Sequence, residues 1–256
     1  MTRKPIPVMM VSFFTMAVIA GSVYANHQIL VGPRTGYHSS EDKRYHRYDE
    51  GFLLGYRYNF NVGNMFQMDA GLENTTDIMI GFNDRNEGTL LGTDMLLEPG
   101  FGLLFTALIP FTARFRTGFS YRSKNYSWTY TNPDIFDSHY GSNGFGFFYA
   151  PGLFFQNDIG YIGCILTNRL HFGRQKMEYN GGDDFSDGFR EKMMDWGFEA
   201  GLNGRRVSHT LAFVFSRRKS TTNDTWSSWK DTRSTKSLTY KIGINLPEVL
   251  KLPRIR

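Results

Sequence analysis

The segment FTARFRTGFSYRSK, residues 111–124, decides the fold class of this chain. Its odd-numbered positions, from Phe111 to Tyr121, carry mostly aromatic or small side chains, whereas its even-numbered positions carry polar ones, including Arg114 and Arg116. Successive side chains of a β-strand point to opposite faces of a sheet. The alternation therefore predicts a strand with one apolar face and one strongly polar face.

The same two-residue period recurs along the chain. Further segments that show it are 51–60, 66–73, 91–98, 144–155, 162–172, 194–202, 210–216 and 238–246. A shorter segment, Ile29–Val31, is the candidate for an additional first strand. Because single-chain bacterial barrels have an even number of strands, we expect about ten strands, or eight if the weaker region 90–106 is miscounted.

The connections between these segments alternate in length. Short turns are expected near residues 61–64, 108–110, 156–158 and 203–205, and long polar links near residues 33–48, 74–89, 125–142, 179–190 and 220–235. Short turns at one end and long loops at the other are typical of a transmembrane up-and-down β-barrel. The predicted fold is therefore all-β and antiparallel, closed so that no strand edge is left unpaired.

The N-terminal segment has the pattern of a secretory signal peptide at residues 1–25. Arg3 and Lys4 precede an apolar run at 8–20, and Val23 and Ala25 offer small residues before the cleavage point. A transmembrane helix is the alternative, but the run is shorter than the roughly 20 residues that span a bilayer. We therefore expect an exported chain with a barrel at residues 26–246 and a short tail at 247–256.

The composition bears on two further classes of protein, those stabilised by disulfides and those that bind nucleic acid. The chain has one cysteine, Cys164, which excludes an intramolecular disulfide. It carries 29 Lys and Arg against 24 Asp and Glu, and loss of Arg3 and Lys4 with the signal peptide leaves a net charge of +3. So small a charge gives no reason to expect a nucleic-acid partner.

An exported chain with a two-residue period, aromatic strand ends and alternating short and long links resembles the small outer-membrane β-barrels of Gram-negative bacteria. The resemblance implies location in the outer membrane, with membrane lipid, lipopolysaccharide and the barrel-assembly machinery as partners. One departure is the tail Pro247–Arg256, because such barrels often end on an aromatic residue. A soluble β-sandwich is the alternative, since the alternation alone does not distinguish lipid from a protein core.

The polar faces bring acidic and basic residues to the predicted lumen. These are the acidic Asp69, Glu73, Asp94, Glu98, Asp195 and Glu199 and the basic Arg57, Arg114, Arg116, Arg122, Arg169 and Lys241, with His171 nearby. In a narrow barrel, opposite charges should meet across the lumen. They could form an ion-pair plug that makes the barrel rigid, or line a water-filled pore and set its ion preference.

Two further groups of residues are candidates for binding sites. Aromatic residues in the predicted surface loops, as ligand contacts or as membrane-interface anchors, are Tyr126, Trp128, Tyr130, Trp226 and Trp229. Asp183, Asp184 and Asp187 lie in a glycine-rich link, but their spacing lacks the pattern of a calcium-binding EF-hand. We therefore expect no metal and no cofactor.

Some barrels of this architecture are enzymes, either omptin-like proteases or lipid A deacylases. His139 lies in a predicted loop with Asp134 and Asp137, where an omptin-like site would be. Ser208 and His209 are adjacent in a strand, so they face opposite ways and are not expected to pair. The expected function is a structural barrel or a narrow porin-like passage for small solutes and ions, without catalysis. A surface-loop adhesin or receptor is the alternative, and an outer-membrane hydrolase is less favoured.

Overall fold

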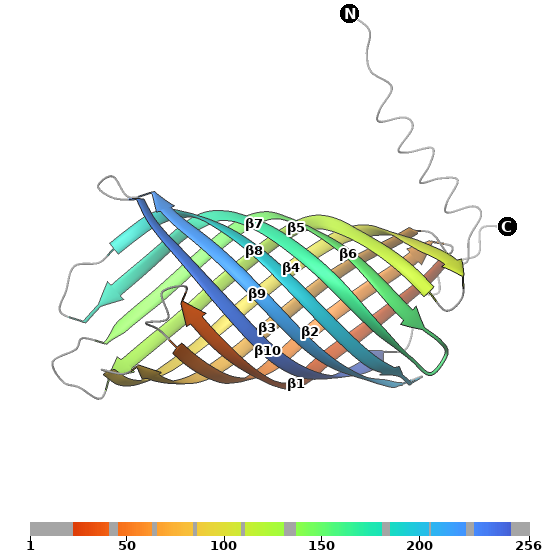
Figure 1. Cartoon of the computed structure of the whole chain (residues 1–256), viewed down its shortest axis with the longest axis horizontal. Helices are drawn as coiled ribbons and strands as arrows, with labels where there is room; N and C mark the ends of the chain where they lie inside the picture. Colours follow the sequence, from red (N-terminus) through yellow and green to blue (C-terminus); the bar gives the residue numbers. More distant parts are fainter. Residues whose placement is uncertain are drawn as a thin grey trace, which may run out of the picture.

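The structure is a computed structural model, and it describes residues 23–40, 46–62, 66–83, 86–108, 111–130, 137–180, 185–204, 206–223 and 228–246. Its strands are β1 Val23–Ser40, β2 His46–Val62, β3 Phe66–Asn83, β4 Asn86–Leu108, β5 Phe111–Tyr130, β6 Ser138–Gln156, β7 Gly160–Tyr179, β8 Phe185–Asn203, β9 Val207–Asn223 and β10 Ser228–Leu246. Each strand pairs antiparallel with its neighbours in sequence, and β1 pairs with β10 to close the barrel (Figure 1). The predicted all-β barrel of about ten strands is confirmed, and the eight-strand alternative is wrong because residues 90–106 lie within β4.

The first strand begins earlier than the sequence suggested. Val23 pairs with Val62 and Ala25 pairs with Phe60, so the end of the expected signal peptide contributes to β1. Residues 1–22 and the tail 247–256 lie outside the described residues, so the rest of the expected signal peptide and the C-terminal tail stay predictions. Because His27 pairs with Leu246, β1 begins and β10 ends at the same end of the barrel.

The expectation of long polar links is wrong over most of their length, because the strands continue through them. The β3–β4 ladder reaches the pair Asn83–Asn86, and the β9–β10 ladder reaches Asn223–Ser228. Ladder hydrogen bonds satisfy the backbone whatever the side chains are, so a polar stretch does not by itself end a strand. We call this end of the barrel the link end, and the end with the short β6–β7 and β8–β9 connections the turn end.

The outer surface of the barrel is apolar. Phe119, Phe145 and Ile162 point outward with 65%, 69% and 67% of their surface exposed. On β6 the exposed residues alternate strictly with buried ones, and Phe148, at 2% exposed, points inward. The outer rows are therefore apolar, and on β6 the inward row from Gly144 to Phe154 consists of glycine, alanine and phenylalanine. The charged residues that line the cavity come from other strands.

Among the described residues, no helix has the length and the apolar character needed to cross a membrane.

Candidate functional site: the charged lumen

The inside of the barrel holds a cavity of about 810 Å³. Its walls run from Asn203 and Gly204 at the turn end to Trp128 and Met177 near the link end. The lining residues that the sequence analysis assigned to the lumen are Arg57, Asp69, Glu73, Asp94, Glu98, Arg114, Arg116, Arg122, Arg169, Asp195, Glu199 and Lys241. His171 also faces inward but lies behind the cavity wall, with 1% of its surface exposed.

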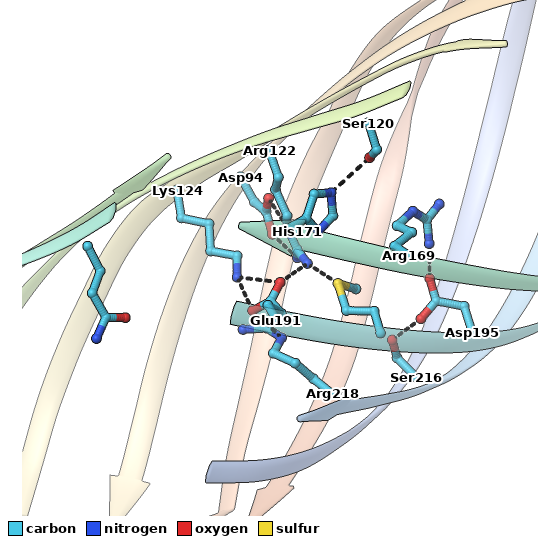
Figure 2. Close-up of polar contacts among 12 residues, drawn as sticks. Asp94, Ser120, Arg122, Lys124, Arg169, His171, Glu191, Asp195, Ser216 and Arg218 are labelled. Atoms are coloured by element: carbon cyan, nitrogen blue, oxygen red, sulfur yellow. Dashed lines mark hydrogen bonds and ion pairs between the residues drawn. The ribbon is translucent and has the colours of Figure 1, made fainter. Parts of the chain in front are cut away.

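A group of five charged residues, which we call the link-end cluster, crosses the half of the lumen nearer the link end. Lys124 Nζ on β5 lies 3.0 Å from Glu191 Oε2 on β8, and Arg218 Nε on β9 lies 3.3 Å from the same oxygen. Arg122 Nη1 lies 3.3 Å from Glu191 Oε1, while its Nε donates to Asp94 Oδ1 at 2.8 Å. Figure 2 shows Lys124 and Arg122 of β5 and Arg218 of β9 converging on Glu191 of β8. The cluster joins opposite walls of the barrel.

A second group, the central cluster, lies next to it toward the turn end. Arg169 on β7 forms two hydrogen bonds with Glu98 on β4, Nε to Oε1 at 2.6 Å and Nη2 to Oε2 at 3.0 Å. Arg169 also pairs with Asp195, which accepts a hydrogen bond from Ser216 (Figure 2). The two parallel hydrogen bonds between Arg169 and Glu98 have a fork-to-fork geometry, which is a strong form of arginine–carboxylate pairing. The pair links β4 and β7 across the intervening β5 and β6.

The central cluster also contains a serine–histidine contact. Ser120 Oγ on β5 donates to Glu98 Oε1 at 3.0 Å and lies 2.9 Å from His171 Nε2 on β7. The strand between them places Gly146 next to both residues in the ladder. A Cβ at Gly146 would collide with the carbonyl oxygen of Leu170. Glycine at this position is therefore required by the close approach of β6 and β7.

The third group, the turn-end cluster, is only partly paired. Arg116 Nη2 lies 2.5 Å from Asp69 Oδ2, and Lys241 Nζ lies 3.1 Å from Glu73 Oε1, which Arg57 also approaches at 3.5 Å. The remaining members behave differently. Arg114 places its guanidinium 4.7 Å from the centre of the Phe154 ring, and neither Arg114 nor Glu199 forms an ion pair with a described residue.

The sequence analysis did not predict that three charged members of the link-end cluster face the lumen: Lys124, Glu191 and Arg218. Each continues the inward row of a recognised strand, Lys124 after Arg122 and Glu191 before Asp195. Glu191 and Arg218 lie beyond the predicted strand ends, which were placed where the sequence turned polar, whereas Lys124 ends the predicted strand 111–124 but was not assigned to its inward row. Extending the two-residue period by one or two steps would have found them.

The prediction that the candidate aromatic residues lie in surface loops is wrong for Tyr126 and Trp128. Tyr126 and Trp128 lie within β5 and line the cavity, so they are neither loop residues nor anchors on the outer surface. The β4–β5 ladder carries them inward by continuing as far as the pair Gly88–Tyr130. Trp229 belongs to β10, and Trp226 lies outside the described residues. Tyr126 instead stacks on Tyr140 of β6, with ring centres 6.3 Å apart.

The histidines and acids considered for catalysis are dispersed. Ser208 faces the cavity and accepts a hydrogen bond from Gln28 at 2.7 Å, whereas His209 lies on the outer surface beside Tyr240 at 2.7 Å. His139 Nδ1 lies 3.0 Å from Ser127 Oγ, and Asp134 is outside the described residues. Asp183 and Asp184 are outside them as well. Within the described residues, no three His, Cys, Asp or Glu side chains are grouped to hold a metal ion.

No protein-family model matches the sequence, and no curated protein sequence matches it either. In fold, the chain is similar to the outer membrane protease OmpT from Escherichia coli, with a TM-score of 0.51 and 9% identity over 87% of this chain and 95% of that one. It is also similar to the translocator domain of the autotransporter NalP from Neisseria meningitidis, with a TM-score of 0.44 and 11% identity over 94% and 96%. The likeness to OmpT shows the fold of an outer-membrane β-barrel.

Proposed function

We propose that this protein lets small ions and polar solutes pass through a narrow, charge-lined lumen in a bacterial outer membrane. The observation that carries the proposal is the cavity of about 810 Å³, whose walls include charged residues from several strands and run from Asn203 at the turn end to Trp128 near the link end. Fixed charges in such a passage set which ions enter. The link-end cluster and the central cluster are its narrow part, because their side chains reach across the lumen.

The outer surface supports the location in a membrane. A row of large apolar side chains with more than half of their surface exposed, such as Phe119, Leu153 and Ile162, is costly in water and favourable in lipid. We further propose that the protein contacts lipopolysaccharide and is inserted by the barrel-assembly machinery, as barrels of this architecture are. The long strands then extend the barrel beyond the bilayer, since a strand needs only about 9–11 residues to cross it.

A closed, structural barrel is the competing interpretation, and the charge balance weighs against it. Arg114 lines the cavity and forms no ion pair with a described residue. A dry plug would have to hold its guanidinium without water or a counter-ion, which is strongly unfavourable. A water-filled lumen avoids this cost.

Conductance in a planar lipid bilayer tests the proposal. The refolded protein, with folding confirmed by heat-modifiable gel mobility, should give stable unitary steps. Replacing Lys124→Ser together with Glu191→Ser should raise the step size, because the two long side chains that meet across the lumen become short and stay polar. The exposed pair Lys176–Glu178 offers a matched control, and Lys176→Ser with Glu178→Ser should leave the steps unchanged. A folded, inserted but silent barrel would overturn the proposal and favour a structural or surface-receptor role.

We propose no catalytic role for the lumen. The Ser120–His171 pair resembles a nucleophile and its base, but both residues are only 1% exposed. The second ring nitrogen, His171 Nδ1, is buried and has no partner among the described residues. In serine–histidine enzymes a third group orients the base at that atom. Hydrolysis of peptides or lipid A by the purified barrel, lost in Ser120→Ala, would contradict this assignment.

A further inference from the structure

At the turn end, the basic residues that line the cavity outnumber the acidic ones. Arg114 on β5 lines the cavity and forms no ion pair with a described residue. By contrast Arg116, two residues further along the same inward row, is paired with Asp69. Arg114 is therefore a lumen cation whose charge is not balanced by direct contact with any carboxylate in the part of the chain that the structure describes.

The surroundings of Arg114 hold its guanidinium in a defined pose. The group lies 4.7 Å from the centre of the Phe154 ring, an inward side chain of the neighbouring strand β6 that is 9% exposed. An aromatic face attracts a guanidinium and leaves the N–H groups at its edge free to donate. These N–H groups suit a small planar or tetrahedral oxyanion, which accepts two parallel hydrogen bonds.

The other charged residues of the turn-end cluster do not make the surroundings of Arg114 unfavourable for an oxyanion. Asp69 is paired with Arg116, and Glu73 is shared between Lys241 and Arg57. Glu199 is the one carboxylate there without an ion pair among the described residues, and it lies on β8, across the lumen from β5. The cluster thus retains more positive than negative charge.

We infer that Arg114 is a binding site for small anions, such as phosphate or a carboxylate, and that the passage prefers anions over cations. The preference rests on the proposed passage, whereas the binding site exists whether or not the lumen conducts. A narrow, charge-lined pore of this kind concentrates ions opposite in sign to its uncompensated charge.

The reversal potential in a gradient of potassium chloride measures the preference. The unaltered protein should be anion-selective, and Arg114→Glu should lower the chloride-to-potassium permeability ratio by about twofold or more, with Arg114→Lys retaining most of it. Arg190 is a matched control, because its guanidinium also lies over a phenyl ring, 5.7 Å from the centre of the Phe172 ring. Unlike Arg114, it lies on the outer surface of the barrel. Arg190→Glu should leave the ratio unchanged. Cation selectivity, or equal effects of the two glutamate variants, would overturn the preference.

Equilibrium dialysis of inorganic phosphate against the folded barrel in detergent tests the site independently of conduction. Phosphate binding that is lost in Arg114→Gln and kept in Arg190→Gln supports the site. A silent barrel that still binds phosphate through Arg114 would overturn the passage and keep the site. A conducting barrel whose phosphate binding is the same in both variants, or absent, would overturn the site and leave the passage standing.

Discussion

Lys124 Nζ on β5 and Glu191 Oε2 on β8 lie 3.0 Å apart, although β6 and β7 separate their strands in the barrel wall. Both residues are buried, at 5% and 3% exposed. The pair therefore crosses the lumen rather than running along one ladder. Arg122 and Arg218 bind the same carboxylate, so Glu191 is the common partner of three cations.

Removal of Glu191 should destabilise the barrel strongly. Glu191→Gln leaves Lys124, Arg122 and Arg218 close together, and breaking a buried ion pair in this way costs about 3–5 kcal/mol. Urea unfolding in lipid vesicles measures the loss. Lys124→Met combined with Glu191→Leu should recover part of it. Equal losses in the single and double variants would contradict the role assigned to the pair.

Exposed ion pairs provide the comparison for that experiment. Lys176 donates a hydrogen bond to Glu178 at the link end of β7, and this contact keeps the pKa of the Glu178 carboxyl below its usual value. Solvent and salt screen such a pair. Lys176→Gln should therefore leave the unfolding midpoint almost unchanged.

Gly146→Ala should destabilise the barrel and separate Ser120 from His171. The added Cβ would meet the carbonyl oxygen of Leu170, which belongs to the rigid β6–β7 ladder. Overpacking of this kind costs about 1–3 kcal/mol. Gly71→Ala is the control, because a Cβ at Gly71 has nothing within 4 Å. The free energies of unfolding of the two variants, measured in urea, should differ by most of that amount. Equal midpoints would show that the β6–β7 ladder shifts to make room for the added Cβ.

A charged side chain placed on the outer surface should lower the stability of the barrel only where that surface lies within the bilayer. Phe119→Arg places a guanidinium where 65% of the side chain faces outward, and in lipid this costs about 2–4 kcal/mol near the middle of the bilayer. Thr129→Arg lies in the same outward row but close to the link end of β5, where little change is expected. Folding into lipid vesicles measures both. Similar stabilities would argue against a lipid-facing surface at Phe119.

The single cysteine reports on the same surface. Cys164 is exposed on the outside of β7, so it would react readily if the barrel were surrounded by water. In lipid vesicles a membrane-impermeant thiol reagent should not label it, because the reactive thiolate forms poorly in an apolar medium. Thr129→Cys with Cys164→Ser should be labelled under the same conditions. Labelling of Cys164 in the vesicles would contradict its contact with lipid.

The sequence alone was sufficient for the class of fold and the side of the wall that each charge faces. A strand turns successive side chains to opposite faces, so the alternation around Arg114, Arg116 and Arg122 predicts their inward position without knowledge of any neighbour. The strand ends were less predictable. Backbone pairing continues through polar residues, and for this reason Glu191, Arg218 and Trp128 were left out of the lumen.

Only the tertiary structure decided which charges meet. The partners Lys124 and Glu191 are 67 residues apart in the chain, and Arg169 and Glu98 are 71 apart. Their contact depends on the stagger between all the ladders that lie between them, which accumulates around the closed barrel. Arg114 forms no ion pair with a described residue for the same reason, because the stagger also sets where the described carboxylates on other strands are placed. Local periodicity specifies the faces of each strand, whereas closure of the barrel specifies the pairs across it.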